Sequence, residues 1–326
     1  MLSSLWALTK NAFTEIIRQP IYGILVGVGV ALIGISPLIA MFTLLENDKL
    51  VVDMGLATIF LIGLVLAVLS ASQIISREIE SKTAGAVISK PIGRFVFVTG
   101  KFLGVTLAML AATYLFTIVL LITLRIGVPS AAWYRSDWPA MLGELLPLFG
   151  AILLGFYCNY FYRWSFGATA IMCALPLYGL SFFILLTITP GWQFAWIPQV
   201  YLYKDVYEVF LAAIMVFLGV WVISSIAVAA STRLNVVPNV VICAGVFFVG
   251  MVSRYLFGQY ADTSYVAWVA YRLVPNLQAF WVADQLMSIE PYIPLSYVGM
   301  VAGYAVAFSA AMITLATYLF EQRELI

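Results

Sequence analysis

Long apolar runs separated by short polar segments make up most of this chain. A helix that crosses a bilayer needs about 20 apolar residues, because the hydrocarbon core is about 30 Å thick. The runs of sufficient length lie at about residues 21–45, 55–75, 102–124, 141–162, 166–188, 207–230, 238–257 and 295–319. The pattern therefore predicts an all-α, polytopic membrane protein with about eight transmembrane helices in a single domain over residues 1–326.

The count of spans depends on residues 141–188. Only Arg163 and its neighbours separate the two runs there, so the region is either two full spans or one broken hairpin. The total accordingly lies between six and eight. The first run is too long for the core of a signal peptide and lacks a small-residue cleavage site, which predicts an uncleaved span.

A different periodicity precedes the first span. Apolar residues recur there at helical spacing, with polar residues between them: Leu5, Leu8, Ala12, Phe13, Ile16 and Ile17. Ser3 or Ser4 can cap the start, and Pro20 breaks the pattern. Residues 3–19 are therefore predicted to form an amphipathic helix on the inner membrane surface. Such a helix serves either as a positional anchor or as a contact for a partner subunit.

Composition confirms the membrane environment and excludes several classes of function. The chain is 64% hydrophobic and 10% charged, against about 45–50% and about 25% in soluble domains. Its 16 Lys and Arg against 15 Asp and Glu argue against binding to nucleic acid. The absence of histidine excludes a Ser-His-Asp triad and histidine-ligated metals. Cys158, Cys173 and Cys243 lie in apolar runs, which favours buried free thiols.

Lys and Arg are distributed unevenly between the two sides of the predicted bundle. With the N-terminus inside, ten of the sixteen fall on the inner side: Lys10, Arg18, Arg77, Lys82, Lys90, Arg94, Lys101, Arg163, Arg233 and Arg323. Cytoplasmic loops carry such an excess, so we expect both termini in the cytoplasm. Trp133, Tyr134 and Trp138 then cluster in an outer loop, as membrane anchors or as part of a route of substrate access.

The inner segment 76–101 carries the densest group of charges. Its sequence, SREIESKTAGAVISKPIGRFVFVTGK, is far longer than the few residues that a link between two helices needs. Pro91 and Gly93 force a turn before Arg94 and Lys101. We interpret the segment as a small helical element that docks a soluble partner, the alternative being a solvated connector. On the outer side, residues 258–294 are predicted to contain a short interfacial helix, and the segment as a whole is predicted to cap the outer mouth of the bundle.

Several motifs of energy conversion are missing. The pair Gly100-Lys101 has Gly93 seven positions upstream where a phosphate-binding loop needs five, and Phe102 stands in place of Ser or Thr. Glu144, Glu208, Arg125 and Arg254 all fall near span ends, whereas ion-coupled carriers place ionisable groups at mid-membrane depth. We therefore predict no catalytic, cofactor or metal site in this chain and an external energy source for any transport.

The inner segment resembles that of type-2, exporter-like permeases of ATP-binding-cassette (ABC) transporters. In that family an E-x-E-x-x-T group follows the second span, and a Pro-x-x-Arg turn and a Lys lead into the third. The matching positions here are Glu78, Glu80, Thr83, Ser89, Pro91, Arg94 and Lys101. Further similar stretches are Arg18-Gln19-Pro20, Ser231-Thr232-Arg233, Val274-Pro275-Asn276 with Phe280, and Phe320-Glu321-Gln322-Arg323-Glu324. The family commonly has six spans, so the region 141–188 would be an additional pair.

The resemblance implies a partner and a mechanism. Such permeases pair with a second permease copy or a homologous one, and with two copies of a cytoplasmic ABC ATPase that binds the ATP and Mg. The segment 76–101 would be the coupling helix, and the contact residues would be Arg77, Glu78, Glu80, Lys82, Thr83, Pro91, Arg94 and Lys101. The implied location is the prokaryotic cytoplasmic (inner) membrane, among its lipids, with alternating access as the mode of transport.

Two readings of function follow. The first is the permease subunit of an ATP-driven exporter, which is not itself an enzyme. The second is a non-transporting scaffold or regulatory subunit of an envelope complex, which would use the same docking segment without a path between its spans. An intramembrane enzyme is disfavoured, because the spans show no convincing pair of catalytic groups. The sequence does not specify the transported substrate.

Overall fold

The computed structural model describes residues 2–41, 47–80, 93–128, 137–195, 206–260, 264–286 and 292–322. The regular secondary structure of this part of the chain is helical, apart from one isolated β-bridge between Ile188 and Phe194. Its long helices are α1 (Leu2–Ile17), α2 (Pro20–Ala40), α3 (Asn47–Glu80), α5 (Arg94–Ile126), α6 (Trp138–Tyr162), α7 (Phe166–Leu185), α8 (Val206–Ser231), α9 (Val236–Met251) and α13 (Leu295–Glu321). Short elements join α9 to α13: α10 (Ser253–Leu256), η2 (Gly258–Tyr260), α11 (Tyr265–Leu273), η3 (Leu277–Phe280) and α12 (Ala283–Leu286).

Seven of these helices are long and apolar enough to cross a membrane: α2, the Lys49–Ile75 part of α3, α5, α6, α7, α8 and α13. The prediction of an all-α polytopic membrane protein is therefore confirmed. Residues 141–188 form two helices of spanning length, α6 and α7, joined at Arg163, whose positive φ of 55° closes the turn. Both helices therefore have the length and the composition that the two-span alternative requires.

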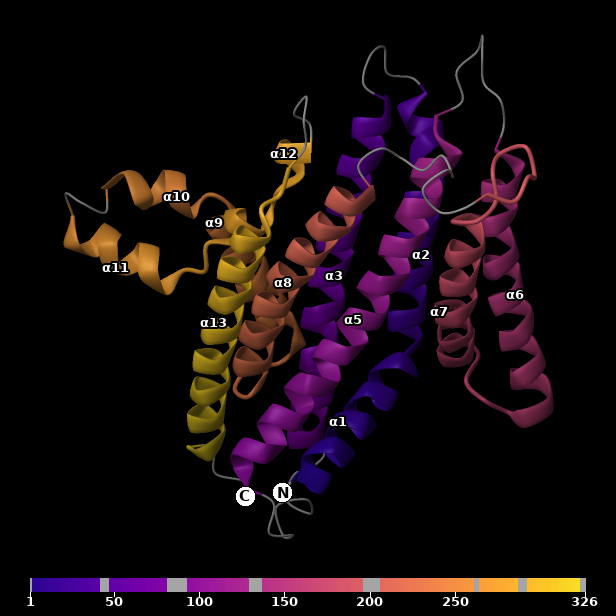
Figure 1. Cartoon of the computed structure of the whole chain (residues 1–326). Coiled ribbons are helices and arrows are strands. Elements are labelled where there is room, and N and C mark those ends of the chain that lie inside the picture. The colour runs from indigo at the N-terminus through magenta and orange to yellow at the C-terminus, as the bar shows by residue number, and fades with distance from the viewer. Residues whose placement is uncertain are drawn as a thin grey trace.

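The bundle is built around α3, α5 and α8. These helices bury most of their length, whereas α6 and α13 bury little. Figure 1 shows α13 on one side of this core and the α6–α7 pair on the other. Stacked rings such as Phe102 on Trp221 fill the space between α5 and α8. Such packing holds the bundle together, because lipid provides no hydrophobic force between helices.

The start of α1, the start of α5 and the end of α13 lie together at one end of the bundle (Figure 1). We refer to this end as the inner end, following the Lys and Arg bias of the sequence. The opposite end, where α6 begins and α7 ends, is the outer end.

The predicted seventh span, 238–257, is not one continuous helix. The chain bends by 67° between α9 and the segment Ser253–Tyr260. The segments that follow the start of α9 nevertheless contact α8 at successive positions along its length. Asn239 of α9 donates to the carbonyl of Ala227 at 3.0 Å, Phe280 of η3 packs against Gly219, and the amide of Ile293 donates to Glu208 at 2.9 Å.

Ala227 and Glu208 are about 28 Å apart along α8 at 1.5 Å per residue, close to the thickness of a hydrocarbon core. The path through α9, η3 and α12 therefore has the length of a further, discontinuous pass, which is the seventh in chain order. Irregular backbone at membrane depth is tolerated where protein covers it. Leu277, Phe280 and Val282 are accordingly buried.

Helices α10 and α11 interrupt this pass as a lateral excursion. Figure 1 shows them projecting from the bundle beside α9 and α13. Helix α11 lies within the predicted outer segment 258–294, and Arg272 stacks on Trp268 at 4.3 Å along its surface. The excursion does not lie over the end of the bundle, whereas α12, a later part of the same predicted segment, contacts α3 and α8 near the outer end (Figure 1). That the segment as a whole caps the mouth stays a prediction. The apolar pattern of residues 265–273 indicates a helix, but it does not indicate how that helix is oriented relative to the bundle.

The cysteines are free thiols, as predicted. Cys243 is buried and contacts Asn239 at 3.3 Å, whereas Cys158 and Cys173 are half-buried. Asn239 also donates to Ser72 of α3 at 2.7 Å. This buried amide therefore joins α3, α8 and α9 by hydrogen bonds, which act across membrane helices as polar ties.

Candidate functional site

The predicted coupling residues lie at the inner end of the bundle, between α3 and α5. Arg77, Glu78 and Glu80 belong to the last turns of α3, but their side chains are outside the described part of the structure. Lys82, Thr83 and Pro91 lie wholly outside the described residues. Helix α3 continues to residue 80 and α5 begins at residue 94, so about half of the segment 76–101 extends the flanking helices.

The two described members of this set differ in their surroundings. Arg94 is exposed at the first position of α5. Lys101 is 1% exposed, with its ammonium 3.8 Å from Glu15 of α1 and 5.7 Å from the ring of Phe97. Lys101 therefore joins α5 to α1 inside the protein, and Arg94 is the member of this pair whose side chain is accessible to a partner.

Helix α1 packs closely along the inner part of α5. A Cβ added at Gly104 would lie 2.4 Å from Cβ of Ala12 and 3.0 Å from the carbonyl oxygen of Thr9, and one added at Gly100 would lie 2.8 Å from Leu8. The Gly100/Gly104 pair thus provides a groove for α1, as small residues do between membrane helices. Helix α1 corresponds to the amphipathic helix predicted over 3–19, and its buried face lies on α5. That it lies on the membrane surface stays a prediction.

The connection between α1 and α2 is a sharp break. The backbone of Gln19 is extended, with ψ at 130°, and Pro20 begins α2. Proline excludes the helical conformation from the residue before it, which explains why the helix stops here. The break leaves the side chain of Arg18 exposed at the inner end of α2. No carboxylate of the described residues forms an ion pair with it.

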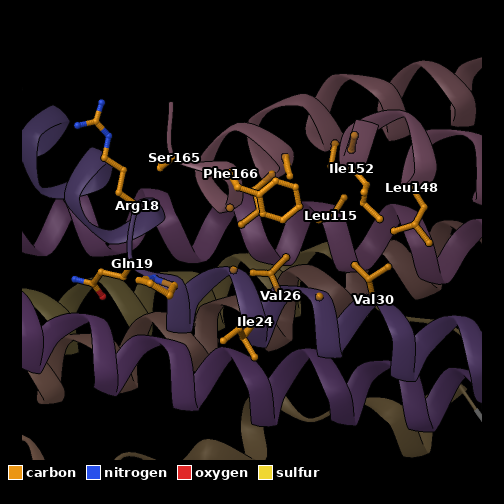
Figure 2. A pocket seen from close by; sticks show the side chains of 18 of the residues that line it. Arg18, Gln19, Ile24, Val26, Val30, Leu115, Leu148, Ile152, Ser165 and Phe166 are labelled. Atoms are coloured by element: carbon orange, nitrogen blue, oxygen red, sulfur yellow. The ribbon is translucent and has the colours of Figure 1, made fainter. Parts of the chain in front are cut away.

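A cavity of about 530 Å³ begins at this break and extends between α2, α5, α6 and α7. In Figure 2, Arg18, Gln19 and Ser165 lie toward one end of it and Leu148, Ile152 and Val30 toward the other. The remaining walls are apolar apart from the hydroxyl of Tyr178. We refer to this cavity as the α2–α7 crevice. Its volume lies in the range typical of ligand sites, about 300–1,000 Å³.

Two glycines shape the crevice. A Cβ added at Gly23 would lie 3.7 Å from Cα of Gly167, so α2 and α7 approach closely at their inner ends. One added at Gly27 would meet nothing within 4 Å, and Gly27 lines the crevice. Ile24, which also lines it, is 63% exposed. The crevice therefore opens sideways, on the surface that would face lipid.

Several ionisable side chains lie inside the outer half of the bundle. The sequence placed these residues near span ends but did not show that they lie between helices. Glu144 of α6 lies 3.4 Å from the hydroxyl of Thr123 of α5, and a Cβ at Gly34 of α2 would approach its carboxylate to 2.7 Å. Glu144 therefore sits between three helices. Ionisable groups inside a membrane bundle commonly mark functional or structural constraints.

A buried ion pair lies nearby. Arg125, 8% exposed, bonds Asp137 at 3.0 Å and donates to the carbonyls of Leu185 and Ile188, the latter at 2.6 Å. Asp137 also accepts from the amide of Ala140 and so caps α6. The pair joins the outer ends of α5, α6 and α7. Within the described residues, no cluster of three or more potential metal-binding side chains occurs.

The fold and the composition define an all-α, multi-pass integral membrane protein. No protein-family model matches the chain, and no match to it was found among curated proteins.

Proposed function

We propose that this protein is the membrane-spanning subunit of an ATP-driven transporter, acting as an exporter in a prokaryotic cytoplasmic membrane. Its partners would be two copies of a cytoplasmic ABC ATPase and a second permease, either identical or homologous. The observation that carries the proposal is the position of the charged segment 76–101. It directly joins α3 and α5, two of the three helices at the core of the bundle.

This position suits the transmission of force. Buried helices packed in a core move as rigid elements, because close-packed interiors do not deform continuously. A partner that displaced the segment between α3 and α5 would therefore displace the core itself. A docking segment attached to a peripheral helix such as α13 would lack this effect.

A second connection leads from the same segment to the crevice. Helix α1 is fastened to α5 through Gly104 and through Lys101 with Glu15. It continues into α2 across the break at Gln19. Movement of the inner end of α5 would thus move α1 and change the angle at which α2 meets α7. Alternating access requires such a linked set of rigid helices.

The first experiment tests docking. A photoreactive amino acid at position 80 of the full-length chain, in native membranes, is expected to crosslink to a nucleotide-hydrolysing protein, whereas the same group at Trp138 at the outer end is not. Glu78→Lys and Arg94→Glu should each reduce the crosslink at least fivefold, because reversed charges oppose a complementary partner surface. Arg163→Glu, an exposed charge in another turn, is the matched control.

The second experiment tests transport. The co-purified complex, reconstituted in vesicles, should show ATP hydrolysis that falls in parallel with the crosslink in the Glu78→Lys and Arg94→Glu variants. Unchanged assembly and hydrolysis in both variants would refute the coupling role. Assembly with intact hydrolysis but no ATP-dependent flux of any native membrane component would support the scaffold alternative instead.

A further inference from the structure

The α2–α7 crevice combines three properties that together specify a ligand. It has a cationic end at Arg18, apolar walls, and a lateral opening at Ile24. Water-soluble substrates would find few hydrogen-bond partners on such walls. A molecule with an anionic head and an apolar chain would match both parts.

The length of the crevice matches one leaflet of a bilayer. Its α2 wall runs from Pro20 to Val30, which is about 15 Å at 1.5 Å per residue. Half of a hydrocarbon core of about 30 Å is also about 15 Å. An acyl chain that begins at the level of Pro20 would therefore end near Val30 and Leu148, at the deep end of the crevice.

The polar end lies at the depth expected for headgroups. The turn between α6 and α7 contributes Ser165 to the crevice, and this turn and the end of α6 carry exposed aromatic residues. Tyr160, Tyr162 and Trp164 are each more than half exposed, and the rings of Tyr162 and Trp164 lie 5.6 Å apart. Such clusters mark the interface between headgroups and hydrocarbon.

We propose that the α2–α7 crevice binds one acyl chain of an anionic phospholipid of the inner leaflet, with the lipid phosphate at Arg18. Arg18 is suited to this role because it is exposed and has no ion-pair partner within the described residues, and a guanidinium bonds phosphate oxygens in two parallel contacts. This lipid site does not depend on the proposed transport function, since it is a property of the isolated chain.

Native mass spectrometry of the purified full-length protein, titrated with phosphatidylglycerol or phosphatidylcholine, tests the site. Wild-type protein is expected to bind phosphatidylglycerol about fivefold more tightly, which corresponds to one basic residue at a membrane surface. Arg18→Glu should abolish this preference. Lysophosphatidylglycerol, which has one acyl chain, should bind as tightly as the two-chain lipid.

Gly27→Phe blocks the apolar part without steric conflict at the Cβ position, and it should weaken the binding of both lipids. The matched controls are Arg233→Glu, an exposed arginine in another inner turn, and Gly303→Phe, an exposed glycine of α13 with equal space around it. Both should bind as wild type does. The proposal is overturned if Arg18→Glu and Gly27→Phe retain wild-type binding, or if the controls lose it to the same extent.

Discussion

Replacing Gly104 with alanine is expected to lower the free energy of unfolding by about 3 kcal/mol, the upper part of the range for overpacking a close-packed contact. The new Cβ would lie 2.4 Å from Cβ of Ala12, a distance that real side chains do not adopt. Backbone atoms of Thr9 and Phe13 lie at 3.0 Å and 3.1 Å, so no rotamer change can relieve the contact. Helix α1 must therefore move away from α5.

Thermal unfolding of the purified protein in detergent, followed by tryptophan fluorescence, measures this loss. The double variant Gly104→Ala with Ala12→Gly should recover part of it, because the Cβ of Ala12 is then absent. Gly303→Ala is the control: its Cβ meets no atom within 4 Å, so it should be neutral or stabilising by up to about 1 kcal/mol. A Gly104→Ala protein as stable as this control would show that α1 is not seated on α5.

The positions of the helices could be predicted well from the sequence. Apolar runs of 20 or more residues are a strong signal in a membrane protein, because every backbone group must be satisfied within the helix. The break at Gln19-Pro20 could also be predicted, since proline excludes the helical conformation from the residue before it. The glycine pair at 100 and 104 packs against α1, a contact that only the structure reveals.

The seventh pass could not be predicted because its signal is not local. Residues 238–257 have the hydropathy of a span, yet the chain turns by 67° at Val252. The bend is stabilised by contacts with distant residues. A Cβ at Gly250 would lie 2.8 Å from the carbonyl oxygen of Pro275, and Phe247 packs edge-on against Phe60 of α3 at 5.2 Å. Hydropathy counts apolar residues and does not detect such contacts.

The crevice and the buried charges also could not be predicted from the sequence. Val26, which lines the crevice, and Val28, which is exposed, are the same residue type two positions apart. Lys101 has the sequence context of a surface residue in a charged segment, but the groove formed by Gly100 and Gly104 places it under α1. In a membrane protein, apolar residues face both the lipid and the protein core. The apolar pattern of the sequence therefore does not distinguish lipid-facing from buried positions.

Replacing Arg125 with methionine is expected to cost about 3–5 kcal/mol of stability, the usual cost of breaking a buried ion pair by removing one partner. The change leaves the Asp137 carboxylate buried without its cation, and it removes the donor that satisfies the carbonyls of Leu185 and Ile188. The carbonyl of Leu185 is at the outer end of α7, where the helix dipole also favours a positive charge, and Ile188 follows this end closely.

The same pair explains why the loss should be specific to the α6–α7 hairpin. Asp137→Asn keeps an oxygen that can cap α6, so it should cost less than Arg125→Met, and the double variant should cost less than the sum of the two. Thermal unfolding measures all three, and Arg254→Met, an exposed arginine in α10, is expected to stay within about 0.5 kcal/mol of wild type. Strictly additive losses would mean that Arg125 and Asp137 stabilise their helices separately. Coupled losses would identify this ion pair as the contact that fastens the hairpin, and with it one wall of the crevice, to α5.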